Sequence, residues 1–262
     1  MSRLSSDQAI LKVDRAAERI AELNTFLNET RPFRYFVKTD LDACKRSTFA
    51  EENHTAVDRT AIIIGDAAHN LRSALDFAYG EIVLPFATSP KERRAVQFPF
   101  SQTRDRLEEA VKNRLAHRVS DRFFKAIMRL LPHHEEGGNR MLAIIDEIDI
   151  PDKHTGLAPV ADYRRISFDL LRTQIPDFPN LGGNIQVQGG VGDVQWPLNG
   201  IPPDLGDAIP PFTGIFKKQI DVPIDIVIKV RGDGFGMPAV PTLNKLIDTV
   251  KGTIAIMRNE AP

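Results

Sequence analysis

The feature that most constrains the fold is a long helical pattern that runs from about Asp58 to Leu84 and ends at Pro85. With about 27 residues, this helix is long enough to form the backbone of a bundle. Apolar side chains recur on it every three or four residues and share one face. That face carries Ile64, Ala68, Leu71, Leu75, Ala78 and Ile82. We therefore predict a helical bundle whose core is covered by this stripe.

Four further helical patterns occupy the first 155 residues. They cover about residues 6 to 30, Arg104 to Arg114, Asp121 to Leu131, and the segment "NRMLAIIDEIDIP", which we expect to end before Pro151. The stretch 34–51 has no helical period and alternates loosely, which indicates a β-hairpin inside the helical region.

The pattern changes to strands after His154. "RRISFDLL" and "NIQVQ" alternate, and the clearest strand is "QIDVPIDIVIKV", residues 219–230. Pro223 lies off the apolar face of that strand and favours an edge position or a bulge. A final helix opens at Pro241.

This order of elements predicts an α+β fold, with an N-terminal helical bundle, a C-terminal antiparallel β-sheet and a final C-terminal helix. Two divisions of the chain fit the pattern. In one, residues 1–155 form the bundle and residues 156–262 form the sheet and last helix. In the other, the last helix covers one face of the sheet and joins everything into a single domain.

Composition excludes several classes of protein. The chain has 34 Lys and Arg against 35 Asp and Glu, so no global field attracts nucleic acid or an anionic membrane. The single cysteine, Cys44, excludes an intramolecular disulfide and a cysteine-based zinc site. The start of the chain has no apolar signal region, and no run of about 18 apolar residues occurs. We therefore expect a cytoplasmic protein with no membrane partner.

Charged side chains interrupt the central helix. At 100° per residue, His69, Arg72 and Asp76 share one stripe. The apolar side chains of Ile62, Tyr79 and Val83 bracket this stripe, which indicates partial burial. Partly buried charges need partners, because an unpaired one costs several kcal/mol.

A second polar cluster, "DEIDIPDKH", ends the last helical pattern of the bundle and supplies such partners. Because neighbouring helices of a bundle pack together, we expect Arg72 to meet Asp149 or Asp152, and His154 to lie near His69. The simpler interpretation is an ion-pair network that fixes helix register, and the alternative is an active or binding site.

The site interpretation assigns two sets of residues and no metal or cofactor. The candidate catalytic residues are His69, Arg72, Asp76 and His154, and the candidate binding residues are Asn70, Asp149, Asp152 and Lys153.

The same residues carry a resemblance. "IGDAAHNLRSALD" and the later "LLPHHEEGGNRMLAIIDEIDIPDKH" resemble a family of uncharacterised bacterial proteins with HNLRSALD, GGN and DKH motifs in that order. More distantly, the helical part resembles the HEPN superfamily. That resemblance implies a dimerising helical bundle and a metal-independent endoribonuclease site made of an Arg and a His on one helix. Arg72 matches the Arg, but Phe77 occupies the position of the His, so His69 or His154 would have to replace it.

These observations favour a non-catalytic interaction module, or a module that binds a ligand or RNA, because the expected His is missing. The Pro-rich segment 197–211 and the edge-like strand 219–230 offer surfaces for RNA or a protein partner, including a second copy of the chain.

The first alternative is an endoribonuclease in which a His activates the ribose 2′-hydroxyl and Arg72 stabilises the phosphate. Positions 91–129 carry eleven Lys or Arg against five Asp or Glu, which favours phosphate contact, although a solvated helix face is the commoner cause of such a run. The second alternative is a metal-binding bundle, suggested by the spacing of Asp66 and His69 and by the run His133 to Glu136. The sequence leaves open whether the protein is an enzyme.

Overall fold

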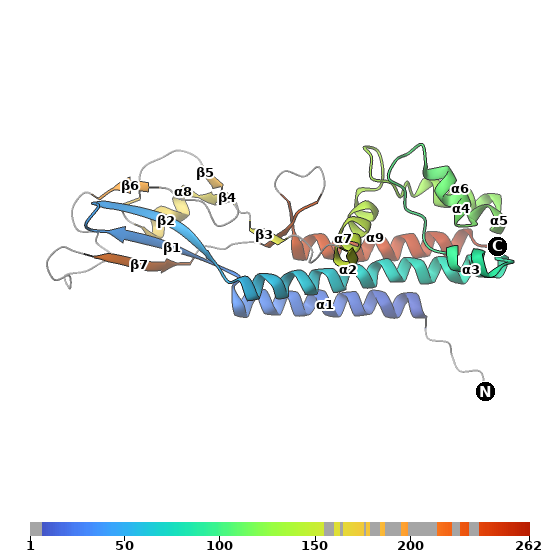
Figure 1. Ribbon diagram of the computed structural model, residues 1–262, viewed down its shortest axis with the longest axis horizontal. Coiled ribbons are helices and arrows are strands. Elements are labelled where there is room, and N and C mark those ends of the chain that lie inside the picture. The colour runs from blue at the N-terminus through green and yellow to red at the C-terminus, as the bar shows by residue number, and fades with distance from the viewer. Residues whose placement is uncertain are drawn as a thin grey trace, which may run out of the picture.

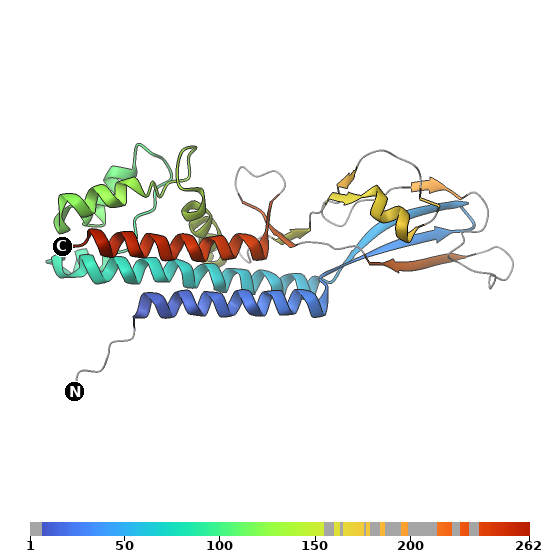
Figure 2. The same ribbon diagram turned by 180° about the vertical axis from the view of Figure 1, so that it is seen from behind.

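The computed structural model has the predicted α+β fold, with long helices side by side and an antiparallel sheet beyond one end of them (Figure 1). The view from behind shows the same arrangement, and helix α9 ends at the pole opposite the sheet (Figure 2). The structure describes residues 7–154, 160–162, 165–175, 177–178, 184–186, 195–198, 214–221, 226–230 and 236–262. Within 150–170 it describes the backbone alone.

Three long helices form the bundle: α1 (Gln8–Thr30), α2 (His54–Val83) and α9 (Ala239–Glu260). Helix α2 begins four residues before the predicted start, because the Asn53 side chain caps it by accepting a hydrogen bond from the Ala56 N–H (3.2 Å). The predicted apolar stripe is buried, with Ile64, Leu71 and Leu75 fully inaccessible. Burying each such side chain contributes about 1.5–3 kcal/mol. No helix in the described residues is both long and apolar enough to cross a membrane.

Shorter helices pack along α2 and α9, with α7 nearer the middle of α2 and the others at the end away from the sheet (Figure 1). They are η1 (Leu84–Phe86), α3 (Pro90–Ala95), α4 (Leu107–Asn113), α5 (Ala116–Val119), α6 (Asp121–Arg129) and α7 (Arg140–His154). The prediction that the last of these ends before Pro151 is wrong, since α7 continues to His154. A proline inside a helix removes one backbone hydrogen bond without forbidding the helix.

The predicted hairpin at 34–51 is confirmed as β1 (Phe33–Asp40) and β2 (Lys45–Glu52). It forms the centre of a four-stranded antiparallel sheet of order β6-β2-β1-β7, completed by β6 (Gln195–Pro197) and β7 (Ile215–Ile220). A second apolar core lies on this sheet. It contains Tyr35, Val37, Leu171, Ile175, Phe178, Trp196 and Ile220.

The prediction of one strand over 219–230 is wrong. Strand β7 ends at Ile220, and β8 (Ile226–Ile228) belongs to a different sheet, between β3 (Val160–Asp162) and β9 (Met237–Pro238). Strand β7 does lie at an edge of its sheet, within the described residues. Of "RRISFDLL", β4 (Arg165–Ser167) pairs with β5 (Asn184–Gln186), and the rest forms helix α8 (Phe168–Gln174). Most of segment 197–211 lies outside the described residues.

Elements that precede residue 155 in the chain and elements that follow it belong to the same sheet and the same helical bundle. The hairpin of the first half pairs with β6 and β7 of the second, and α9 packs on α1 and α2. The apolar stripe of α9 explains this choice, because Leu243, Leu246 and Val250 are fully buried in the bundle core. The chain thus leaves the bundle after α1, builds the hairpin and returns as α2.

Candidate functional site

Helix α7 packs against α2 and brings the two predicted charged clusters together. Arg72 Nη1 forms an ion pair with an Asp146 carboxylate oxygen, and Arg72 Nε lies 3.8 Å from Asp76 Oδ2. Arg72 thus meets the segment "DEIDIPDKH" of α7 at Asp146, one turn before the expected Asp149. Asp149 lies beside His69, and the side chain of Asp152 lies outside the described residues.

An aromatic loop closes over Arg72. The guanidinium carbon lies 4.1 Å from the ring centroid of Phe100, close enough for a cation–π contact. Phe98 packs edge-on against Phe100, and its backbone N–H donates to Asp76 Oδ1 (2.8 Å). Arg72 thus has carboxylates and a ring around it and is largely buried.

His69 occupies the outer edge of the same helix face. Its Nδ1 lies 2.8 Å from Oδ1 of the buried Asp149, while the His69 side chain itself is 45% exposed. A carboxylate at Nδ1 fixes the tautomer that carries its hydrogen there and leaves Nε2 as the acceptor when the ring is neutral. Within the described residues Nε2 has no hydrogen-bond partner. His69 and Asp149 therefore have the form of a base with its orienting acid.

His134 is a member of the network that the sequence did not reveal. Its Nε2 lies 2.9 Å from Asp146 Oδ2 and its Nδ1 lies 3.2 Å from Glu147 Oε1. The hydrogen bond to Asp146 raises the pKa of His134, against the effect of burial, and Glu147 adds to the rise. Burial acts to raise the pKa of Asp146, but the hydrogen bond from His134 and the charge of Arg72 outweigh it and lower that pKa. Both groups are thus stabilised in their charged forms.

The loop before α7 turns His134 back onto this helix. Leu131 and Gly137 have positive φ, and the Asn139 N–H donates to the Leu131 carbonyl (2.8 Å). Gly138 is required there, because a Cβ atom would lie 2.2 Å from the His133 carbonyl oxygen. The Gly137–Gly138 pair is the signal in the sequence for this turn.

The remaining predicted residues do not join the network in the described part of the chain. Asn70 accepts a hydrogen bond from Lys12 Nζ (3.0 Å) and donates to the Asp66 carbonyl (2.7 Å), so it ties α2 to α1. The side chains of Asp152, Lys153 and His154 lie outside the described residues, although their backbone continues α7. Among described residues no group of three or more potential ligands surrounds a metal position.

Several cations of the basic run 91–129 have partners within the structure. Five of its cations pair with carboxylates: Lys112 with Glu108, Arg118 with Glu92, Lys125 with Asp121, and both Arg122 and Arg129 with Glu260. Arg94 and Arg114 donate to the backbone carbonyls of Pro90 and Ala95. The net positive charge counted along the sequence is therefore partly cancelled by α9.

No family model, no curated protein and no solved structure matches this chain. The resemblance to the HEPN superfamily therefore stays a prediction.

Proposed function

We propose that this protein is a non-catalytic binding module, in which the charged residues at the contact of α2 and α7 hold the bundle together. The observation that carries the proposal is the enclosure of Arg72. Its guanidinium already has Asp146, Asp76 and the Phe100 ring as partners. A cation that stabilises a scissile phosphate must instead face the substrate with its charge available.

The residue at the position of the expected His supports the same proposal. Phe77 is exposed on α2 and has no group that transfers a proton. His134 shares Asp146 with Arg72, but both nitrogens of His134 face carboxylates. An imidazole whose two nitrogens both donate hydrogen bonds is the protonated form, and protonated His134 cannot accept a proton as a base.

The experiment is RNA cleavage by the purified full chain, with and without EDTA, on single-stranded and structured RNA. We expect no cleavage above a mock preparation. Cleavage that survives EDTA and is lost in an Arg72→Lys variant of unchanged circular dichroism would overturn the proposal. Phe77→Leu is the matched control on the same helix, because it leaves every charge in place.

The endoribonuclease remains the second candidate, because one observation favours it. His69 is half-exposed, and a buried carboxylate orients its ring through Nδ1. In that case His69→Gln abolishes cleavage in a variant of unchanged circular dichroism, because glutamine removes the base but keeps an N–H group that donates to Asp149. The same variant has no effect on a binding module whose ligand lies elsewhere.

A further inference from the structure

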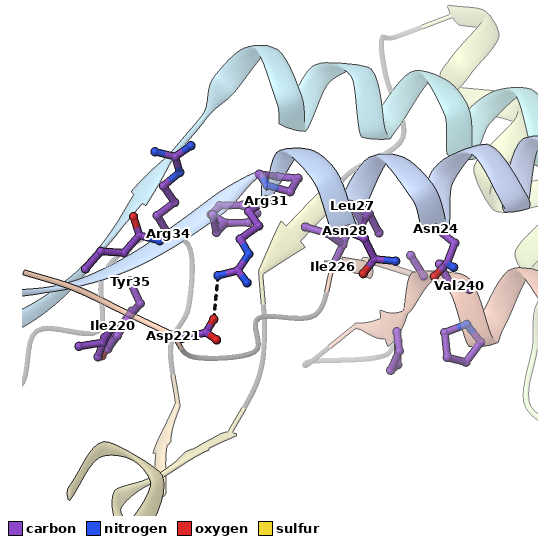
Figure 3. Close-up of a pocket in the computed structure, with 16 residues that line it drawn as sticks. Asn24, Leu27, Asn28, Arg31, Arg34, Tyr35, Ile220, Asp221, Ile226 and Val240 are labelled. Carbon is purple, nitrogen blue, oxygen red and sulfur yellow. Dashed lines mark hydrogen bonds and ion pairs between the residues drawn. The ribbon is translucent and has the colours of Figure 1, made fainter. Parts of the chain in front are cut away.

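A cavity of about 710 Å³ lies where the helical bundle meets the four-stranded sheet (Figure 3). The end of α1, the first residues of β1, the end of β7 and the start of α9 form its walls. Its volume is typical of small-molecule sites, and such sites favour junctions between structural units. The described residues that line it include none of the Arg72 network.

The charges at this cavity are balanced. Arg31 Nη1 lies 2.7 Å from Asp221 Oδ1, and both side chains are well exposed. Arg34 also belongs to the lining, but its guanidinium points to the opposite side of β1 (Figure 3). The cavity therefore presents one cation beside one anion, a poor match for a phosphate and a good match for a zwitterion.

Side-chain amides supply the remaining polar groups. Asn24 and Asn28, one turn apart on α1, line the cavity (Figure 3), and Gln219 of β7 also belongs to its lining. Each amide offers a donor and an acceptor. The two aromatic lining residues, Phe33 and Tyr35, are buried, so among described residues no free ring stacks on a nucleobase.

We propose that this cavity binds a free α-amino acid. The carboxylate and ammonium groups of an α-amino acid are adjacent, as Arg31 and Asp221 are, so the ligand replaces their ion pair with one bond to each. An exposed pair contributes little by itself, which makes the replacement favourable. Asn24, Asn28 and Gln219 then bind a polar side chain directly or through water. The inference rests on the proposed binding function and names its ligand class.

The test begins with the full chain and the standard L-amino acids, each at millimolar concentration, in a thermal-shift assay. The strongest ligand is then compared by calorimetry with its deaminated and its decarboxylated analogues. We expect each analogue to bind at least about tenfold more weakly, because each leaves one charged partner without a bond.

Charge variants assign the two contacts. In Arg31→Gln the amino acid binds no better than its decarboxylated analogue, and in Asp221→Asn it binds no better than its deaminated analogue. Arg15→Gln is the matched control: Arg15 is an equally exposed arginine of α1 that pairs with Glu18 and does not line the cavity, so we expect unchanged binding.

Three results would overturn the inference: no amino acid raises the melting temperature, the analogues bind as well as the amino acid, or Arg15→Gln weakens binding as much as Arg31→Gln. These results are independent of RNA cleavage. If the protein both cleaves RNA and binds an amino acid, only the non-catalytic proposal is refuted. If it does neither, only the proposal of an amino-acid ligand is refuted.

Discussion

Two arginine–aspartate pairs in this protein have the same chemistry and different surroundings. The side chains of Arg72 and Asp146 are 14% and 6% exposed, whereas those of Arg31 and Asp221 are 53% and 76% exposed. The first pair is covered by Phe100 and His134, and the second lies open at a cavity. Because solvent hardly reaches it, the Arg72–Asp146 pair fixes α2 against α7. The Arg31–Asp221 pair is open to solvent, so a ligand is able to rearrange it.

Removing one charge from the buried pair and removing one from the exposed pair should change the stability of the protein by different amounts. Removing one member of a buried pair leaves the other charge without water or counterion, whereas an exposed charge is simply hydrated. Two residues of the charged stripe of α2, His69 and Arg72, have carboxylate partners on α7, and Asp146 is the partner of Arg72. The variants below test this difference from the largest expected effect to the smallest.

Asp146→Asn has the largest expected effect. It removes the carboxylate shared by Arg72 and His134 and leaves two cations facing each other in a poorly hydrated site. We expect the free energy of unfolding to fall by about 3–5 kcal/mol, as for other broken buried pairs. Urea denaturation monitored by circular dichroism measures it.

Asp221→Asn is the matched change in the exposed pair. We expect a loss below about 1 kcal/mol. Equal losses for the two aspartates would contradict the assignment of Arg72 as a structural residue.

The pH dependence of stability gives a second, smaller effect. The pKa of His134 is raised in the folded state, so its stabilisation is complete below the unfolded pKa and is lost as pH rises through the folded value. The pKa of Asp146 is lowered, so its stabilisation holds above the unfolded pKa and is lost as pH falls through the folded value. The network is most stable between these limits.

His134→Gln isolates the alkaline limit. We expect this variant to be less stable than the wild type near about pH 6 and to approach it at a pH above the raised folded pKa of the wild-type ring. Denaturation curves at both pH values give the comparison. A stability difference that does not change with pH would show that the charge of His134 contributes nothing.

Helical periodicity predicted the part of the site that lies on a single helix. Spacing placed His69, Arg72 and Asp76 on one stripe and implied burial, and the acidic end of α7 was the evident partner. The register between α2 and α7 is set by side-chain packing across the contact, which spacing does not encode, so Asp146 was missed. His134 was missed because a loop with two positive φ angles brings it back to α7.

In the fold, too, elements that depend on neighbouring residues could be predicted, whereas contacts between residues far apart in the chain could not. Helix α1, helix α9 and the hairpin of β1 and β2 depend on neighbouring residues, and each was predicted. The pairing of β1 with β7 joins residues far apart in the chain, and nothing in the alternation of 219–230 indicates that it spans two sheets. Strand pairing of that kind depends on tertiary packing more than on local pattern.

A double-mutant cycle on Arg31 and Asp221 has the smallest expected effect. With Arg31→Gln, Asp221→Asn and the double variant, we expect a coupling energy of about 0.2–1 kcal/mol, because the exposed side chains lose entropy to form one bond. Molar salt should remove this coupling, since charges in water are screened over about 3 Å at that concentration. The same salt should leave most of the Arg72–Asp146 coupling, because ions do not enter the space beneath Phe100. If salt weakens both couplings equally, solvent reaches Arg72, and the charge assigned to holding α7 is available to a substrate after all.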